Sequence, residues 1–161
     1  MSAVEWTWAP FAALSGREVY ELLSLRQEIF IVEQKCPYHD ADGLDPVARH
    51  LLGRLPAGEL VAYARVLPAG TRLAQASIGR VVVRKDQRGA GLGRALMNEA
   101  LARIAGDDGA IDLALSAQAQ LGSFYASLGF VPTGERFDED GIPHVMMIRR
   151  APRGSQTHEE N

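Results

Sequence analysis

The sequence predicts a mixed α/β fold in which helices cover both faces of one central sheet. Short apolar runs typical of strands fill the first half of the chain, and strands then alternate with helical patterns, an order that favours a mixed sheet. Of the 161 residues, 47% are hydrophobic and 23% are charged, which is ordinary for a soluble globular protein. We therefore expect one domain over residues 1–150, long enough to enclose a sizeable core.

The N-terminal third is expected to form a strand, a helix and a loop. Residues 4–8 alternate apolar and polar side chains, as a half-buried strand does. Ser15 followed by Glu18 is a capping-box pattern that predicts the start of a helix, and the apolar stripe of this helix contains one charge, Arg26. Over residues 32–46 the periodicity fails among acidic residues, prolines and a glycine, which predicts a structured loop that could include a helical turn.

The remaining elements alternate strands and helices. Residues 50–55 and 60–67 are apolar runs joined by Pro56-Ala57-Gly58, which predicts a hairpin, and residues 78–83 form a β-branched third run. A helical pattern runs to residue 104, a strand is expected at 111–117, and a short helix at 121–128 should stop at Gly129. Strands at 130–131 and 145–148, separated by an acidic turn at 138–141, complete the sheet. The polar tail at 151–161 is expected to be disordered.

Composition excludes several classes of partner. The formal net charge of −3 gives no general attraction to nucleic acid or to an anionic membrane. No apolar run approaches the roughly 18 residues of a membrane span, and the N-terminus does not resemble a signal peptide. Cys36 is the only cysteine, so it has no partner for a disulfide or a cysteine-based metal site. We expect a cytoplasmic protein without a metal.

The turn at Arg88–Gly93 is the predicted anion-binding site. Three glycines end a strand and begin a helix there, so backbone N–H groups can converge at the positive end of a helix dipole and bind an anion such as pyrophosphate. Arg84, Lys85 and Arg94 add positive charge around the turn. A Walker A loop would need Gly-Lys-Ser/Thr, and a dinucleotide fingerprint would need glycine or alanine where Arg94 or Leu96 stands, so neither fits. A glycine-rich connection that binds nothing is the alternative.

Two motifs at the expected separation resemble those of the GNAT acetyltransferases. Residues 88–93 match the R/Q-x-x-G-x-G/A pattern, and residues 124–130 match a second signature, a tyrosine four residues before Gly-Phe. The segments 30–38, 61–65, 117–119 and 140–144 resemble the ElaA-type branch of this family. The similarity extends from about residue 6 to 149.

The resemblance implies a mainly antiparallel sheet in which two parallel strands, 78–83 and 111–117, splay into a V. Acetyl-CoA would lie in this V, with its pantetheine paired to backbone near Val81 and Val83, and the Val81 N–H would bind the thioester oxygen. Without that role, both valines are simply buried strand residues. The coenzyme-binding residues so implied are Val81, Val82, Val83, Arg88, Gly89, Ala90, Gly91, Leu92, Gly93, Arg94, Gln118 and Tyr125.

The resemblance also implies Tyr125 as the general acid that protonates the departing thiolate, since a phenol carries its proton at neutral pH. The alternative for Tyr125 is a core aromatic. Seven residues before the tyrosine the family often has asparagine, and this chain has Gln118.

An amine nucleophile must lose a proton, and Glu33 is the first candidate base, with Arg26 as its expected ion-pair partner. That pairing could equally make Glu33 a structural counter-ion, and His50 and His144 are alternative bases. Asp40, Asp42 and Asp45 could attract a cationic amine or cap turns. The tentative acceptor site consists of Arg26, Glu33, Asp40 and His144.

The expected function is therefore transfer of an acetyl group to a primary amine of a small molecule or peptide, by direct attack in a ternary complex. The alternatives are an acyl-CoA sensor without turnover and a ligand-free interaction domain. A homodimer could form through the final strand, 145–148.

Overall fold

The computed structural model describes residues 3–152 and contains a seven-stranded mixed sheet in the order β1-β2-β3-β4-β5-β7-β6. All neighbouring strands are antiparallel except β4 and β5, which are parallel. The strands are β1 (Glu5–Pro10), β2 (Arg49–Arg54), β3 (Leu60–Leu67), β4 (Ala76–Val83), β5 (Leu113–Gln118), β6 (Val131–Glu139) and β7 (Ile142–Arg149). The predicted mixed α/β fold is confirmed.

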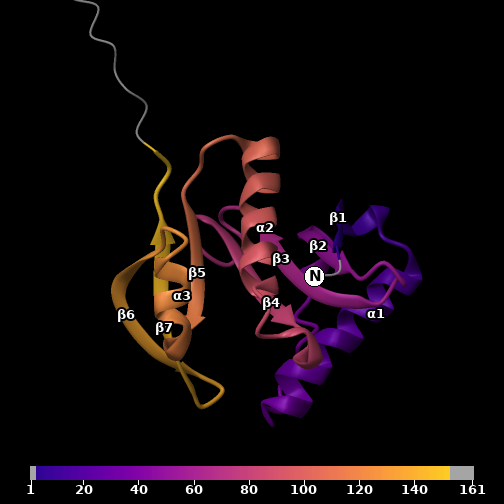
Figure 1. Ribbon diagram of the computed structural model, residues 1–161. Coiled ribbons are helices and arrows are strands. Elements are labelled where there is room, and N and C mark those ends of the chain that lie inside the picture. The colour runs from indigo at the N-terminus through magenta and orange to yellow at the C-terminus, as the bar shows by residue number, and fades with distance from the viewer. Residues whose placement is uncertain (1–2, 153–161) are drawn as a thin grey trace, which may run out of the picture.

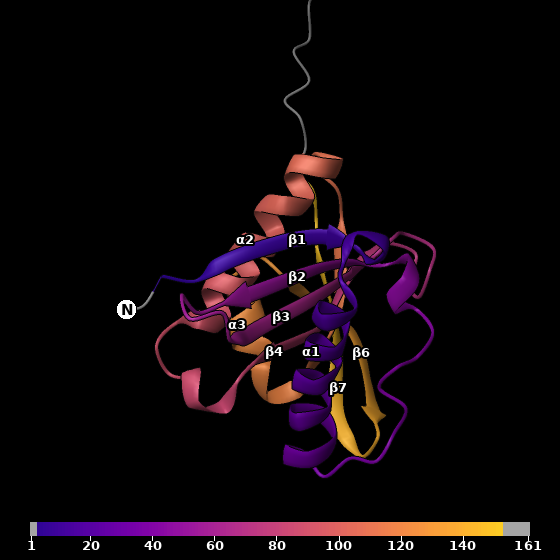
Figure 2. The ribbon, with the colours of Figure 1, turned by 90° about the vertical axis from the view of Figure 1, so that its right-hand side faces the viewer.

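Helices cover both faces of this sheet. Helix α1 (Gly16–Gln27) lies on one face, and α2 (Leu92–Asp108) and α3 (Gly122–Ala126) lie on the other (Figure 2). The predicted capping box is formed at the start of α1, where Ser15 and Glu18 exchange side-chain to backbone hydrogen bonds. Short 3-10 turns lie at η1 (Phe11–Ala13), η3 (Asp45–Val47), η4 (Lys85–Gln87) and η5 (Ala119–Leu121).

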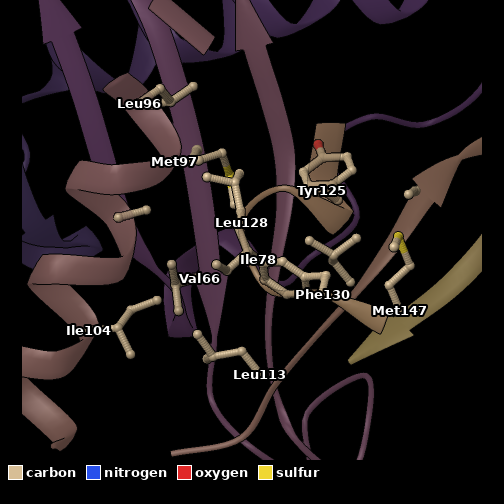
Figure 3. Close-up of a cluster of buried hydrophobic side chains, with 14 of the residues drawn as sticks. Val66, Ile78, Leu96, Met97, Ile104, Leu113, Tyr125, Leu128, Phe130 and Met147 are labelled. Atoms are coloured by element: carbon tan, nitrogen blue, oxygen red, sulfur yellow. The ribbon is translucent and has the colours of Figure 1, made fainter. Parts of the chain in front are cut away.

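Alternate residues of the central strands supply two separate hydrophobic clusters. Leu51 packs with α2 on one face, and its neighbour Leu52 packs with α1 on the other, as the two-residue period of a strand requires. Figure 3 shows part of the larger cluster, in which Leu96 and Ile104 of α2 face the sheet. Each face of the sheet is thus fixed by its own helix.

The sheet opens between its two parallel strands. Strand β4 pairs with β5 only at Ala76–Leu113 and Ser77–Ala114, so the later residues of both strands separate. In Figure 1 the half formed by β1–β4 and the half formed by β5, β7 and β6 diverge below this junction. The expected V-shaped splay is therefore present, and it leaves backbone groups of β4 and β5 without a strand partner.

Three details differ from the sequence-based expectations. The first helix does not stop before residue 32 but continues as a π-helix, η2 (Glu28–Glu33). Strand β6 runs to Glu139, well beyond the expected 130–131, and closes on β7 through a turn at Asp140 and Gly141, which both have positive φ. Strand β7 is paired on both sides, so the expected dimer contact through 145–148 has no free strand edge. Most of the tail predicted to be disordered, from residue 153 onward, lies outside the described residues.

Candidate active site

A cavity of about 490 Å³ occupies the splay. Its walls come from β4 and β5, from η2 and the loop after it, and from α3 and the β6–β7 turn. Eight of the residues predicted for the site line it: Glu33, Val81, Val82, Val83, Arg88, Gln118, Tyr125 and His144. Segments distant in sequence thus converge where the strands separate.

The glycine turn lies next to this cavity and fits a pyrophosphate. Gly89 and Gly91 have φ of +88° and +82°, a left-handed conformation that favours glycine, and a Cβ on either would meet no heavy atom within 4 Å. Helix α2 begins at Leu92 without a side-chain cap and without an acidic residue in its first turn. Its first N–H groups are therefore available to an anion at the positive end of a 17-residue helix.

The basic side chains around the turn are of two kinds. Arg84 is paired with Asp86 and Glu59, and Arg88 is paired with Glu33, so these arginines are neutralised in place. Within residues 3–152, Lys85 and Arg94 make no ion pair; Arg94 donates to the Ser127 hydroxyl and lies over the Phe124 ring. Their charge remains available to a bound phosphate.

Tyr125 is almost fully buried and faces the cavity. Its ring makes edge contacts with Phe124 and Phe130, at centroid separations of 5.1 and 6.1 Å. Burial raises the pKa of Tyr125 to about 12, so the phenol is protonated at any pH at which the protein functions. Figure 3 shows its hydroxyl directed away from Phe130. The ring is therefore part of the core, while its hydroxyl is free to act as a proton donor.

Glu33 does not pair with Arg26, and the prediction of that ion pair is wrong. Its two carboxylate oxygens accept from Arg88 at 3.0 and 2.8 Å, and Arg88 Nε donates to the Val83 carbonyl. The hydrogen bond from Arg88 is the main reason that the pKa of Glu33 lies below its usual range. Glu33 thus links η2 to the start of the glycine turn.

His144 is held in one tautomer. Its Nδ1 lies 2.7 Å from the Ile142 carbonyl oxygen, which can only accept, so Nδ1 carries the proton and Nε2 of the neutral ring has the lone pair. Nε2 lies 3.4 Å from a carboxylate oxygen of Glu139, which would stabilise a proton taken up there. The ring also stacks on Phe137. Nε2 is therefore the ring nitrogen of His144 that is free of a backbone hydrogen bond.

Arg26 and Asp40 do not line the cavity; they belong to a largely buried charge cluster, of which Arg65 and Arg80 reach the cavity wall. Three arginines and three aspartates hold the loop after η2 against the sheet, with paired distances of 2.7 to 3.5 Å. The arginines are Arg26, Arg65 and Arg80, and the aspartates are Asp40, Asp42 and Asp45. The aspartates therefore act mainly as ion-pair partners of the arginines, which the sequence did not predict. Asp42 also accepts from the Leu44 N–H at 3.1 Å, so the turn-capping hypothesis is confirmed for Asp42. His50, another candidate base, is fully buried between Tyr63 and the Asp45 carbonyl.

Arg80 and Ser116 are two of the cavity-wall residues that sequence reasoning missed. Arg80 lines the cavity and has a φ of +51°, rare for a residue with a side chain. The signal was present, since a glycine and an arginine at 79–80 interrupt a β-branched strand, which is typical of a bulge. Ser116 also lines the cavity, and its buried hydroxyl has no hydrogen-bond partner among the described residues. That hydroxyl is available to a polar group of a bound molecule.

Over residues 3–152, no group of three or more His, Cys, Asp or Glu side chains is placed to hold a metal ion. Over the same range, every helix is too short or too polar to cross a membrane.

Comparison with known sequences identifies similar proteins over most of the chain. Residues 47–151 match the sequence model of a family described as Acetyltransferase (GNAT) domain. Protein ElaA of Escherichia coli is 43% identical over 148 residues, which cover 91% of this chain and 96% of that protein.

Solved structures with the same fold include two with high sequence identity. An acyl-CoA N-acyltransferase from Pseudomonas aeruginosa superposes with a TM-score of 0.87 at 44% identity, covering 91% of this chain and 99% of that one. Escherichia coli ElaA superposes with a TM-score of 0.86 at 42% identity, covering 92% of this chain and all of that one. The splayed sheet and the glycine turn thus occur on a fold that these proteins share.

Proposed function

Because this chain belongs to the GNAT acetyltransferase family, in its ElaA-type branch, we propose that it transfers an acetyl group from acetyl-CoA to a primary amine. One observation carries the proposal: the cavity opens at the splay of two parallel strands, and the glycine turn lies beside it at the start of α2. A molecule with a pyrophosphate at one end and an extended amide arm fits both features.

The coenzyme site would use backbone more than side chains. The N–H groups of residues 89–93 and the start of α2 would hold the pyrophosphate, with Lys85 and Arg94 adding charge. The free edge of β4 near Val81 to Val83 would pair with the pantetheine amides. Gln118 lies on the opposite strand, half-buried on the cavity wall, within reach of the same arm.

The transfer is a direct displacement. The amine nitrogen attacks the thioester carbon, a C–N bond forms, and the C–S bond breaks as the sulfur leaves with the bonding pair. The Val81 N–H would stabilise the developing oxyanion, and Tyr125 would donate its hydroxyl proton to the sulfur. The net products are an amide and free CoA.

Two side chains on the cavity wall can accept the proton that the amine loses. Glu33 is ionised, although both of its oxygens are held by Arg88. His144 presents Nε2 next to Glu139. Either could act directly or through a water molecule.

The test begins with the coenzyme. Acetyl-CoA is titrated calorimetrically into the wild type and into a variant combining Arg88→Ala with Gly91→Val. We expect micromolar binding to the wild type and none to the variant. A panel of small amines and short peptides is then assayed for release of the CoA thiol. If the wild type does not bind, the proposal fails. Binding without turnover on any amine would favour an acyl-CoA sensor.

We also propose that this activity is cytoplasmic, where the buried thiol of Cys36 would stay reduced.

A further inference from the structure

We propose that Arg80 is a positioning residue for the acyl transfer: its ion-paired side chain holds a bulge of β4 in the left-handed conformation that aims the Val81 N–H into the splay. The inference rests on the proposed function, since it concerns the group that would bind the thioester oxygen.

The bulge is visible in the register of β4 on β3. Arg65 is opposite Gly79 and Tyr63 is opposite Val82, so between these pairs one residue of β3, Ala64, faces two of β4, Arg80 and Val81. The extra residue in such a bulge is not part of the regular ladder, and it bends the strand locally. The bulge lies just beyond Ser77, the last residue of β4 that pairs with β5.

Beyond the bulge, the side chains of β4 also point to the opposite face of the sheet from the one that a regular strand would give them. Ile78 and Val82 are four residues apart and would share a face in a regular strand, yet Ile78 packs in the α2 cluster and Val82 in the α1 cluster. Val81 and Val83 instead pack against the cluster that contains Ile78. Without the extra residue, every backbone and side-chain direction from residue 81 onward would change.

Arg80 adopts the left-handed conformation at this point. Its φ is +51°, which costs free energy for any residue with a Cβ and persists only where neighbouring structure enforces it. The residue in this conformation is an arginine rather than a glycine or an asparagine, so we infer that contacts of its side chain stabilise it.

The Arg80 side chain is held on several sides. Its Nε lies 2.9 Å from Asp40 Oδ1, an ion pair whose angle is too bent for a hydrogen bond, and its Nη2 donates to the Asp40 carbonyl at 3.3 Å. The guanidinium carbon lies 5.9 Å from the Phe30 ring centroid and 5.6 Å from that of Tyr38, so the cation is enclosed by two aromatic rings. Only 15% of the side chain is exposed.

The partner carboxylate is itself immobilised. Asp40 accepts from Arg26 Nε at 2.8 Å, and Arg26 is fully buried and also bonded to Asp45. Asp40 is therefore held by the buried cluster on one side and holds Arg80 on the other. This chain of contacts connects the loop after η2 to the bulge, and it explains why a long cationic side chain stands at a strained position.

The test separates the backbone conformation from the side chain. Glycine and asparagine accept a positive φ, whereas alanine resists it and β-branched valine resists it most. All four substitutions at Arg80 remove the same ion pairs. We expect kcat in Arg80→Gly and Arg80→Asn to exceed that in Arg80→Val at least tenfold, with Arg80→Ala between them. The Kd for acetyl-CoA and the KM for the amine should change less than threefold.

A second measurement does not depend on turnover. In ¹⁵N-labelled protein, the NMR resonance of the Val81 amide should shift on addition of acetyl-CoA in the wild type, Arg80→Gly and Arg80→Asn. It should shift less in Arg80→Ala. This comparison still tests the inference if Arg80→Val does not fold. Equal kcat values and equal Val81 shifts across the series would overturn the inference while leaving the proposed function intact. A wild type that neither binds acetyl-CoA nor acetylates any amine would overturn the proposed function, and this inference with it.

Discussion

At the scale of single residues, Tyr125 has two roles that one substitution can separate. Its ring packs against Phe124 and Phe130, and a phenylalanine would keep these contacts. Its pKa of about 12 keeps the hydroxyl protonated at neutral pH, so a proton is available when negative charge develops on the leaving sulfur.

We accordingly expect Tyr125→Phe to lower kcat by roughly a hundredfold, the low end of the range for general acids. Steady-state kinetics with the best amine of the panel measures kcat, and calorimetry should give an unchanged Kd for acetyl-CoA. A loss of less than twofold in kcat would show that Tyr125 is only a core aromatic.

Glu33 and His144 can be distinguished because they have different neighbours. Glu33→Gln removes the charge that neutralises Arg88, so we expect it to change mainly the affinity for acetyl-CoA. His144→Gln removes the lone pair beside Glu139, so we expect it to lower kcat at neutral pH. A missing base matters less as the pH approaches about 10, where the amine loses its own proton. The kcat of His144→Gln should therefore recover toward the wild-type value at high pH. The opposite pattern, with recovery in Glu33→Gln alone, would assign the base to Glu33.

At the scale of secondary-structure elements, the glycine turn and helix α2 offer a matched pair of glycines. Gly91 is the N-cap of α2 with a φ of +82°, and Gly106 lies inside the same helix without a positive φ. Neither has a heavy atom within 4 Å of the position that a Cβ would take. The difference between them is therefore backbone conformation rather than space.

We expect Gly91→Ala to destabilise the protein by about 1 kcal/mol and to weaken acetyl-CoA binding at least tenfold. Gly106→Ala should leave binding unchanged and raise stability by up to about 1 kcal/mol. Urea unfolding and calorimetric titration of both variants measure these effects. Unchanged binding in Gly91→Ala would mean that the turn does not hold the pyrophosphate.

Helices, strands and turns were predictable from the sequence where they depend on neighbouring residues. The ion pairs were not predictable, because their partners are distant in the sequence. The capping box at Ser15, the hairpin of β2 and β3, and the stop at Gly129 each depend on residues close in sequence. Arg26 pairs with Asp40 across 14 positions and Glu33 pairs with Arg88 across 55, so their partners depend on the path of a loop without periodicity. The same limit explains the mistaken Arg26–Glu33 pair.

At the scale of the whole molecule, the splay itself is not encoded by any single strand. Strands β4 and β5 pair only at their first two positions, and the sequence of β5 alone does not predict where this pairing ends. The separation coincides with the bulge at Arg80, with the charge cluster beside it and with β7 pairing along the whole of β5. It was predicted only through the resemblance to a known family, since it arises from the combination of distant parts.

The buried charge cluster also makes the stability of the whole protein sensitive to acid. Burial lowers the pKa of His50, which accepts from the Tyr63 hydroxyl and donates to the Asp45 carbonyl, so the ring stays neutral in the fold. Burial would raise the pKa of Asp45, but hydrogen bonds from Arg26 and Arg65 outweigh it and hold that pKa below its usual range. The same balance, with Arg65 as the main partner, lowers the pKa of Asp42.

The lowered pKa values of His50 and of the paired aspartates both make the folding stability fall as the pH falls, but in two different pH ranges. The unfolded chain protonates its histidines below about pH 6.5, where folded His50 resists a proton, so stability should begin to fall there. Stability should fall further below about pH 4, because the aspartates of the unfolded chain bind protons there while the ion-paired aspartates of the folded protein remain ionised. Thermal unfolding from pH 7.5 to 3.5 tests this, and we expect the Tm to drop by at least about 2 °C in the upper window. His50→Gln should abolish that upper slope, whereas His39→Gln, at an exposed position, should retain it. If His50→Gln kept the wild-type slope of Tm against pH, another group would cause the loss of stability in the upper range, and burial of His50 would not be its origin.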